Sequence, residues 1–300
     1  MRAPWSALLG TAVLASLVLG PGTAGANGTS PQADVPDSAD CRTCHEDSLF
    51  QMDRTYHAGV EQGCYACHAG AEAHLAGQME GEDTPGPSMG DLDVSASNEV
   101  CQSCHESTDH ATWTGSAHER RGVACIDCHG VHDFASKNAQ LKTASSAETC
   151  YNCHPAIRAQ SMRTSHHPVR EGLLGCESCH NPHDATTPAM IKADWVNELC
   201  LECHTEKRGP FLWEHAPVRE NCTNCHTPHG SNHEKLLVAK QPYLCQRCHL
   251  NTRHPGTLYD GSNAGTTLAA ASNRAIEHAC KNCHQNVHGS NHPSAPYLGR

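Results

Sequence analysis

The feature that most constrains this chain is a short pattern, Cys-x-x-Cys-His, which occurs ten times and uses every one of the 20 cysteines. In this pattern two thiols form thioethers to the vinyl groups of a haem, and the histidine binds its iron. Zinc is the alternative for a Cys-x-x-Cys pair, but a zinc site needs four ligands and no histidine at the next position. The pattern therefore predicts ten covalent haems c, held by Cys41, Cys44, Cys64, Cys67, Cys101, Cys104, Cys125, Cys128, Cys150, Cys153, Cys176, Cys179, Cys200, Cys203, Cys222, Cys225, Cys245, Cys248, Cys280 and Cys283.

The histidine of each motif supplies the first axial position on its iron. These residues are His45, His68, His105, His129, His154, His180, His204, His226, His249 and His284. The cysteines and the histidine of one motif lie on one face of a helical turn, where they can hold a single macrocycle. The segments from Ser97, Ser145 and Trp195 carry residues that suit a helix start. Short helices that end on haems are therefore expected.

A second set of histidines lies outside the motifs in a repeating order. The motifs pair into five modules, which begin at residues 41, 101, 150, 200 and 245, each with one histidine between its motifs and one shortly after them. His183, only three residues after a motif histidine, cannot easily reach the far face of its own haem, so it is expected to bind a neighbouring haem. Ten bis-histidine, low-spin irons would take His57, His74, His118, His132, His166, His183, His215, His229, His254 and His288 as second ligands.

Two places in this set have competing candidates. HHPVRE from His166 and HAPVRE from His215 match at every position except the second, which favours His166 over His167 as a ligand. In the fifth module His254 and His278 compete, and their positions alone do not separate them. The histidines that this count leaves over, for which surface or turn positions are expected, are His110, His233 and His292.

The first 26 residues predict export from the cytoplasm. Arg2 precedes an apolar run from Ala7 to Gly20, and the small residues Ala24 and Ala26 suit a signal-peptidase site. An uncleaved membrane anchor is disfavoured because the apolar run is short. Thioether attachment of haem takes place outside the cytoplasm, so the signal and the motifs together indicate the periplasm.

The composition predicts a fold without an ordinary core. Only 4% of the residues are aromatic, and about 27 residues per haem remain after residues 1–26 are removed. We expect a multihaem c-type cytochrome with ten stacked haems as its core, elongated and mostly irregular, with short α-helices and little or no β-structure. Residues 27–165 and 166–300 would be two pentahaem halves, and the acidic, Gly- and Pro-rich residues 75–98 are interpreted as a linker or flexible loop.

The charge of the chain restricts its partners. The formal net charge is −11, and haem propionates add to it. This net negative charge argues against nucleic acid and anionic lipid as partners, and it favours redox partners with basic docking faces.

The segments SHHPVREG, EHAPVRENC, NTRHPGTLYDG and CKNCHQNVHGSNHPS, together with ten motifs, resemble the MtrA/DmsE-type decahaem cytochromes. The resemblance covers nearly all of the mature chain. It implies a periplasm-facing electron carrier inside an outer-membrane β-barrel, with periplasmic donor or acceptor cytochromes and an external cytochrome as further partners. The RHP segment at Arg253–Pro255 resembles a family segment and favours His254 over His278.

These features favour an electron conduit between the periplasm and the cell exterior over two alternatives. One alternative is a soluble periplasmic shuttle or electron store. The other is a multihaem reductase, which would keep one iron open for substrate, although all ten motifs carry histidine and 15 further histidines are available. Metal reduction and iron oxidation both fit a conduit, so the direction of electron flow remains open.

Overall fold

The structure, a computed structural model of the 300-residue chain, describes residues 38–107, 110–249, 280–293 and 298. The chain from Pro36 onward forms one compact unit. The predicted signal peptide lies outside the described residues, and so do His254 and His278. The expected boundary between residues 165 and 166 stays a prediction, and hydrogen bonds cross it, for example from the Thr112 hydroxyl to Asp184 at 3.0 Å.

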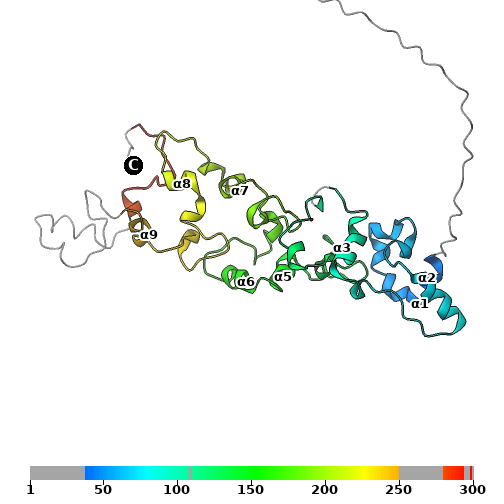
Figure 1. Cartoon of the computed structure of the whole chain (residues 1–300). Coiled ribbons are helices and arrows are strands. Elements are labelled where there is room, and N and C mark those ends of the chain that lie inside the picture. Colours follow the sequence, from blue (N-terminus) through cyan, green and yellow to red (C-terminus); the bar gives the residue numbers. More distant parts are fainter. Residues whose placement is uncertain (1–37, 108–109, 250–279, 294–297, 299–300) are drawn as a thin grey trace, which may run out of the picture. The chain divides into compact units, whose positions relative to one another are not determined.

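Short helices joined by long loops make up the described chain (Figure 1). The α-helices are α1 (Ser38–Leu49), α2 (Ala71–Glu80), α3 (Val94–Gln102), α4 (Cys125–Cys128), α5 (Ser146–Tyr151), α6 (Pro155–Ser161), α7 (Val196–Cys203), α8 (Ala216–Glu220) and α9 (Tyr243–Gln246). Helix α1 contains a kink at the motif histidine His45, whose φ of −114° and ψ of 28° are not helical.

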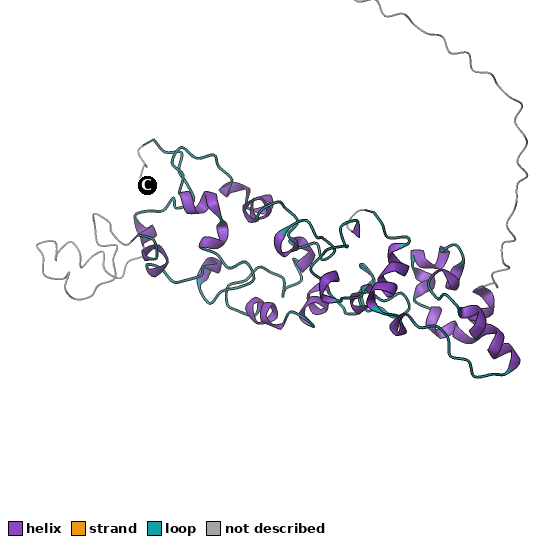
Figure 2. Ribbon diagram, in the orientation of Figure 1, coloured by secondary structure: helices purple, strands orange, loops and turns teal. Residues whose placement is uncertain are grey.

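Single turns of 3-10 helix supply most of the remaining regular structure. They are Met52–Arg54, Tyr56–Gly59, Gly63–Ala66, Met89–Asp91, Glu119–Arg121, Cys176–Ser178, Pro188–Met190, Thr205–Lys207, Cys222–Asn224, Glu234–Leu236 and Cys280–Asn282. No strand occurs in the described residues, which contain only isolated β-bridges (Figure 2). The expected class, short helices in an irregular chain without a sheet, is confirmed.

The helix starts follow local capping. The Ser145 hydroxyl accepts a hydrogen bond from the Glu148 amide at 3.2 Å at the start of α5, and α7 begins directly after Trp195, as expected. The third expected start, at Ser97, is wrong: α3 begins at Val94, because the Asp93 carboxylate accepts from the Ala96 amide at 3.0 Å and caps the helix earlier.

The polypeptide has almost no core of its own. Among the described residues the buried apolar side chains are Leu49, Tyr65, Trp113, Ala124 and Ile191. Five such residues are far fewer than a domain of this size needs to offset the conformational entropy of folding. In the same part of the chain no helix is long and apolar enough to cross a membrane.

The acidic segment interpreted as a linker packs onto the first module. Its Thr84 carbonyl accepts a 2.6 Å hydrogen bond from His74 Nδ1, and its Pro87 carbonyl accepts one from His68 Nδ1 at 3.0 Å. A Cβ on Gly77 would lie 2.2 Å from the Thr84 hydroxyl oxygen, so this approach requires glycine. The segment thus holds two candidate ligands, in addition to joining two modules.

Candidate haem sites

Within every module the two motifs meet at their first cysteines. The neighbouring Cys125 thiol raises the pKa of the Cys101 thiol. In the fourth module burial and the neighbouring Cys222 thiol raise the pKa of Cys200 to about 11. These are properties of free thiols, which haem attachment converts into thioethers. The first cysteines that meet in this way are Cys41 with Cys64, Cys101 with Cys125, Cys150 with Cys176, Cys200 with Cys222, and Cys245 with Cys280.

Between modules the second cysteines face each other instead. Burial raises the pKa of Cys128, and the nearby Cys153 adds to that rise across the module boundary. The second cysteines that lie close in this way are Cys67 with Cys104, Cys128 with Cys153, Cys179 with Cys203, and Cys225 with Cys248. Along the chain, contacts between first cysteines within a module therefore alternate with contacts between second cysteines across a module boundary. As a result, each motif lies beside the motif that follows it in the sequence.

Nine of the ten motif histidines face a second histidine ring. The ring centroids are 5.9 to 6.4 Å apart. The pairs, with the motif histidine first, are His45 with His74, His68 with His132, His105 with His57, His129 with His183, His154 with His118, His180 with His229, His204 with His167, His226 with His288, and His249 with His215.

This spacing suits one iron between two imidazoles. A metal–nitrogen bond of about 2 Å on each side, with each ring centre roughly 1 Å further out, separates two opposed rings by about 6 Å. Two imidazoles at this distance could serve as the two axial ligands of one haem iron. His57, for example, lies opposite His105 at 6.2 Å, and His183 lies opposite His129 at 6.0 Å.

Eight of the nine pairs connect consecutive modules. The first and second modules, for example, are joined by His57 with His105 and by His68 with His132. The exception is His45 with His74, inside the first module. In the second to fifth modules, the histidine that follows the second motif closely thus faces a motif histidine of the preceding module. The binding of a neighbouring haem by His183 stays a prediction.

Backbone carbonyls orient many of these imidazoles. The His118, His167 and His215 Nδ1 atoms lie 2.8, 2.8 and 3.1 Å from the carbonyls of Pro182, Pro228 and Val287. In each case that carbonyl comes from the residue before another predicted ligand. Such a bond fixes the tautomer and leaves Nε2 directed at the metal.

The second motif of three modules uses a left-handed turn for the same purpose. Two consecutive residues with φ between 48° and 58° form each turn, and the first carbonyl accepts Nδ1–H of the motif histidine at 2.6 to 2.9 Å. Left-handed backbone costs a residue other than glycine about 1–2 kcal/mol. Strain repeated at three equivalent places indicates a positional role. The turns are Ala139–Gln140 for His129, Ala189–Met190 for His180, and Lys235–Leu236 for His226.

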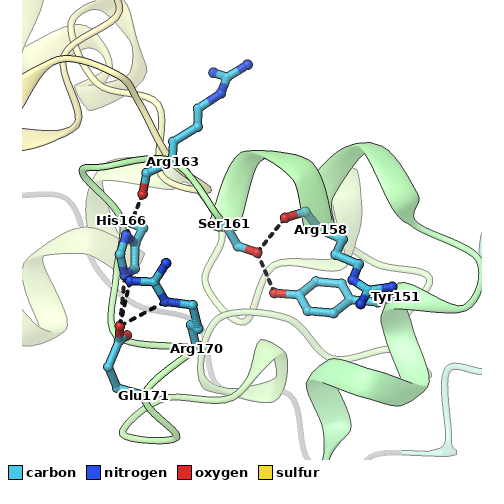
Figure 3. A network of polar contacts seen from close by, with 7 residues as sticks. All are labelled: Tyr151, Arg158, Ser161, Arg163, His166, Arg170 and Glu171. Atoms are coloured by element: carbon cyan, nitrogen blue, oxygen red, sulfur yellow. Dashed lines mark hydrogen bonds and ion pairs between the residues drawn. The ribbon is translucent and has the colours of Figure 1, made fainter.

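His166, the candidate favoured by internal alignment, faces no motif histidine. Its Nδ1 lies 2.7 Å from the Arg163 carbonyl, and its Nε2 lies 3.1 Å from Glu171, whose other partner is Arg170 (Figure 3). Both ring nitrogens already have oxygen partners. His167 is the residue that lies opposite His204, at 6.4 Å.

The backbone register explains this one-residue difference from the expectation. Ser165 bridges Ser231, and Trp213 bridges Ser290, so the residue two positions after each bridge is His167 in one module and His215 in the other. Aligning HHPVRE with HAPVRE pairs His166 with His215, whereas the backbone bridges place His167 at the position equivalent to His215. The sequence spacing contains a signal for His167. His57, His118 and His215 each lie seven positions before the next motif cysteine, and His167, nine positions before Cys176, is closer to this value than His166, which lies ten positions before it.

The remaining histidines divide between described and undescribed parts of the chain. His110 lies 4.4 Å from His183, too close for an iron between the rings, and 5.5 Å from His105. The candidates His254 and His278 for the partner of His284 fall outside the described residues, so that pair stays a prediction.

The chain is similar to known multihaem proteins in two respects. The model of the doubled CXXCH motif family matches residues 118–159, 166–209 and 215–254. The chain is also 39% identical, over 277 residues, to a multiheme cytochrome MtrA from Shewanella baltica (strain OS185). That match covers 88% of this chain and 82% of the relative.

Proposed function

The chain belongs to the multihaem c-type cytochromes of the MtrA type, and on this premise we propose that it conducts electrons between the periplasm and the cell exterior through an outer-membrane β-barrel. The observation that carries the proposal is the unbroken contact of each motif with the next. Electron tunnelling falls steeply with separation, so haems held side by side in sequence order provide a path of short steps.

The proposed cofactors are ten haems c, each with two axial imidazoles. Such irons have closed coordination and bind no substrate, and imidazole ligands without methionine favour low potentials. The nine opposed histidine pairs support this ligation and favour an electron carrier over a reductase. His167 replaces His166 in the proposed ligand set, and His254 remains the proposed partner of His284.

The charges support a particular docking region. Residues 37–109, around the first three motifs, carry 15 carboxylates against two arginines, whereas residues 110–249 carry 14 charges of each sign. A basic periplasmic partner would be drawn to the first three haems, because complementary charge accelerates the encounter of redox proteins. An external cytochrome would then accept or supply electrons elsewhere along the chain.

Haem stoichiometry tests the cofactor proposal. The mature protein should have the mass of the chain from Asn27 plus ten haems, and acidified acetone should extract none of them because all are held by thioethers. Intact-mass spectrometry measures this number. A fully matured preparation with nine haems or fewer would show that one motif is not used.

Electron transfer across a membrane tests the conduit. The purified chain and its candidate barrel are reconstituted in liposomes, a reductant is added outside, and reduction of a trapped dye is followed. The roughly 30 Å hydrocarbon layer blocks unassisted transfer, so the complex should reduce the dye far faster than the barrel alone. If the complex forms and the two rates are equal, the conduit is excluded and a free periplasmic shuttle is the better account.

A further inference from the structure

The loop that carries His183 contains a buried carboxylate that belongs to no haem motif. Asp184, the residue after this histidine, is only 7% exposed. Its carboxylate accepts hydrogen bonds from the Thr186 amide and hydroxyl, both at 2.8 Å, and from the Thr187 hydroxyl at 3.2 Å. A buried carboxylate is costly unless such donors surround it. These donors therefore fix the conformation of the loop next to His183.

One further donor to this carboxylate comes from the preceding module. The Thr112 hydroxyl donates to Asp184 Oδ1 at 3.0 Å. Thr112 lies six residues before His118, whose Nδ1 lies 2.8 Å from the Pro182 carbonyl in the same loop. The second and third modules are therefore joined on both sides of His183, by a backbone carbonyl before it and by a carboxylate after it.

The next two modules make this connection through the backbone instead. Ser165 and Ser231 exchange two hydrogen bonds of 2.9 and 2.7 Å. Trp213 and Ser290 exchange two of 2.9 Å in the same way. Ser231 and Ser290 each lie two residues after a predicted second ligand. Among the isolated bridges of the described residues, none includes Ala185, which has the corresponding position in the third module.

The residue directly after the second ligand explains this difference. It is Gly230 in the fourth module and Gly289 in the fifth, with φ of 146° and 131°. A Cβ on Gly230 would overlap the Gln160 carbonyl oxygen, and one on Gly289 would overlap the ring of the residue at position 211. Only glycine therefore allows the two modules to approach this closely. Asp184 has this position in the third module, and it reaches the preceding module through its side chain.

We propose that Asp184 is a positioning residue for the fourth haem, whose carboxylate replaces the backbone bridge and holds His183 opposite His129. The ring centroids of these two histidines lie 6.0 Å apart, with their planes 25° from parallel. Thr112 belongs to the module that carries His129, so its hydrogen bond joins the loop of the second ligand to the module that binds the haem. This inference rests on the histidine ligation proposed above.

The test uses the mature ten-haem protein and its electron paramagnetic resonance spectrum. Thr112→Val replaces the hydroxyl with a methyl group, and Asp184→Ala removes the whole carboxylate. Each should shift one low-spin signal, the same signal in both variants, because the axial geometry of the fourth iron changes. Thr112→Ser keeps the hydroxyl and should leave that signal where it is in the unmodified protein. If Asp184→Ala fails to mature, the two Thr112 variants still decide the question.

Asp133→Ala is the matched control. Asp133 follows His132 as Asp184 follows His183, but it is exposed. Its loss removes the same charge beside a predicted ligand and should leave every low-spin signal in place. An equal shift in Asp133→Ala and Asp184→Ala would show that only the loss of charge acts, and it would overturn the proposal. The proposal also fails if Thr112→Val shifts no signal, or if Thr112→Ser shifts it equally.

His183→Ala separates this inference from the ligation on which it rests. That variant should convert one iron to high spin, and the low-spin signal that it removes should be the one that Thr112→Val shifts. If His183→Ala leaves all irons low-spin, the ligation is wrong. If it opens an iron whose signal the Thr112 and Asp184 variants never affect, the ligation stands and the role of Asp184 is refuted.

Discussion

A chain made without haem should be unfolded from its first module to its last. The described residues bury five apolar side chains, and the longest helix, α1, has 12 residues. Isolated helices shorter than about 12–15 residues are marginal in water, and no sheet is present in the described residues to bring distant segments together. The macrocycles must therefore supply the apolar surface around which the loops pack.

The measurement compares the mature protein with a variant in which all 20 cysteines are serine. Serine prevents both haem attachment and disulfides between the adjacent first cysteines. The mature protein should show helical circular dichroism and slowly exchanging amides, and the variant should show a disordered spectrum and exchange without protection. Retention of cooperative unfolding in the variant would mean that the polypeptide has a core that its buried residues do not reveal.

His167→Ala should open one iron, and His166→Ala should open none. His167 faces His204 at 6.4 Å, and its Nδ1 is bonded to the Pro228 carbonyl, so its Nε2 is the nitrogen available to the metal. His166 has oxygen partners on both nitrogens. About one tenth of the irons should therefore become high-spin in His167→Ala, with all irons remaining low-spin in His166→Ala.

Electron paramagnetic resonance of the oxidised proteins measures this fraction. Because the two histidines are adjacent, each variant is a control for the other: a general disturbance of the loop should affect both variants alike. A high-spin signal in His166→Ala with none in His167→Ala would restore the ligand that the internal alignment favours. High-spin iron in both variants would show that the Glu171 contact of His166 is needed to hold the loop of His167.

The pairing of ligands also says how the modules stay together. In the proposed ligation, two irons connect each pair of consecutive modules, so the loss of one ligand leaves a second connection in place. A single open iron should therefore change the spectrum of the protein more than its fold, which is the condition for the His167 experiment to be informative.

The sequence alone determines the chemistry of the sites. Haem attachment needs two thiols and a histidine within five consecutive residues, so all ten motifs are visible without any tertiary information. The same holds for the absence of an ordinary core, and for the short helices at Ser145 and Trp195, where capping and the motif lie within one segment. The count of histidines outside the motifs indicates a second ligand for every iron.

Only the tertiary structure decides which imidazole faces which iron. Eight of the nine pairs in the described residues join histidines of different modules, and backbone bridges and carbonyl contacts between modules set their register. His167 rather than His166 lies opposite His204 because the bridge from Ser165 to Ser231 places it there. Residues 75–98 hold His68 and His74 through the carbonyls of Pro87 and Thr84, a role that composition does not reveal because any residue carries a carbonyl. Haem attachment depends on residues within one short segment. The orientation of the axial ligands depends instead on segments that meet only when the chain folds around its haems.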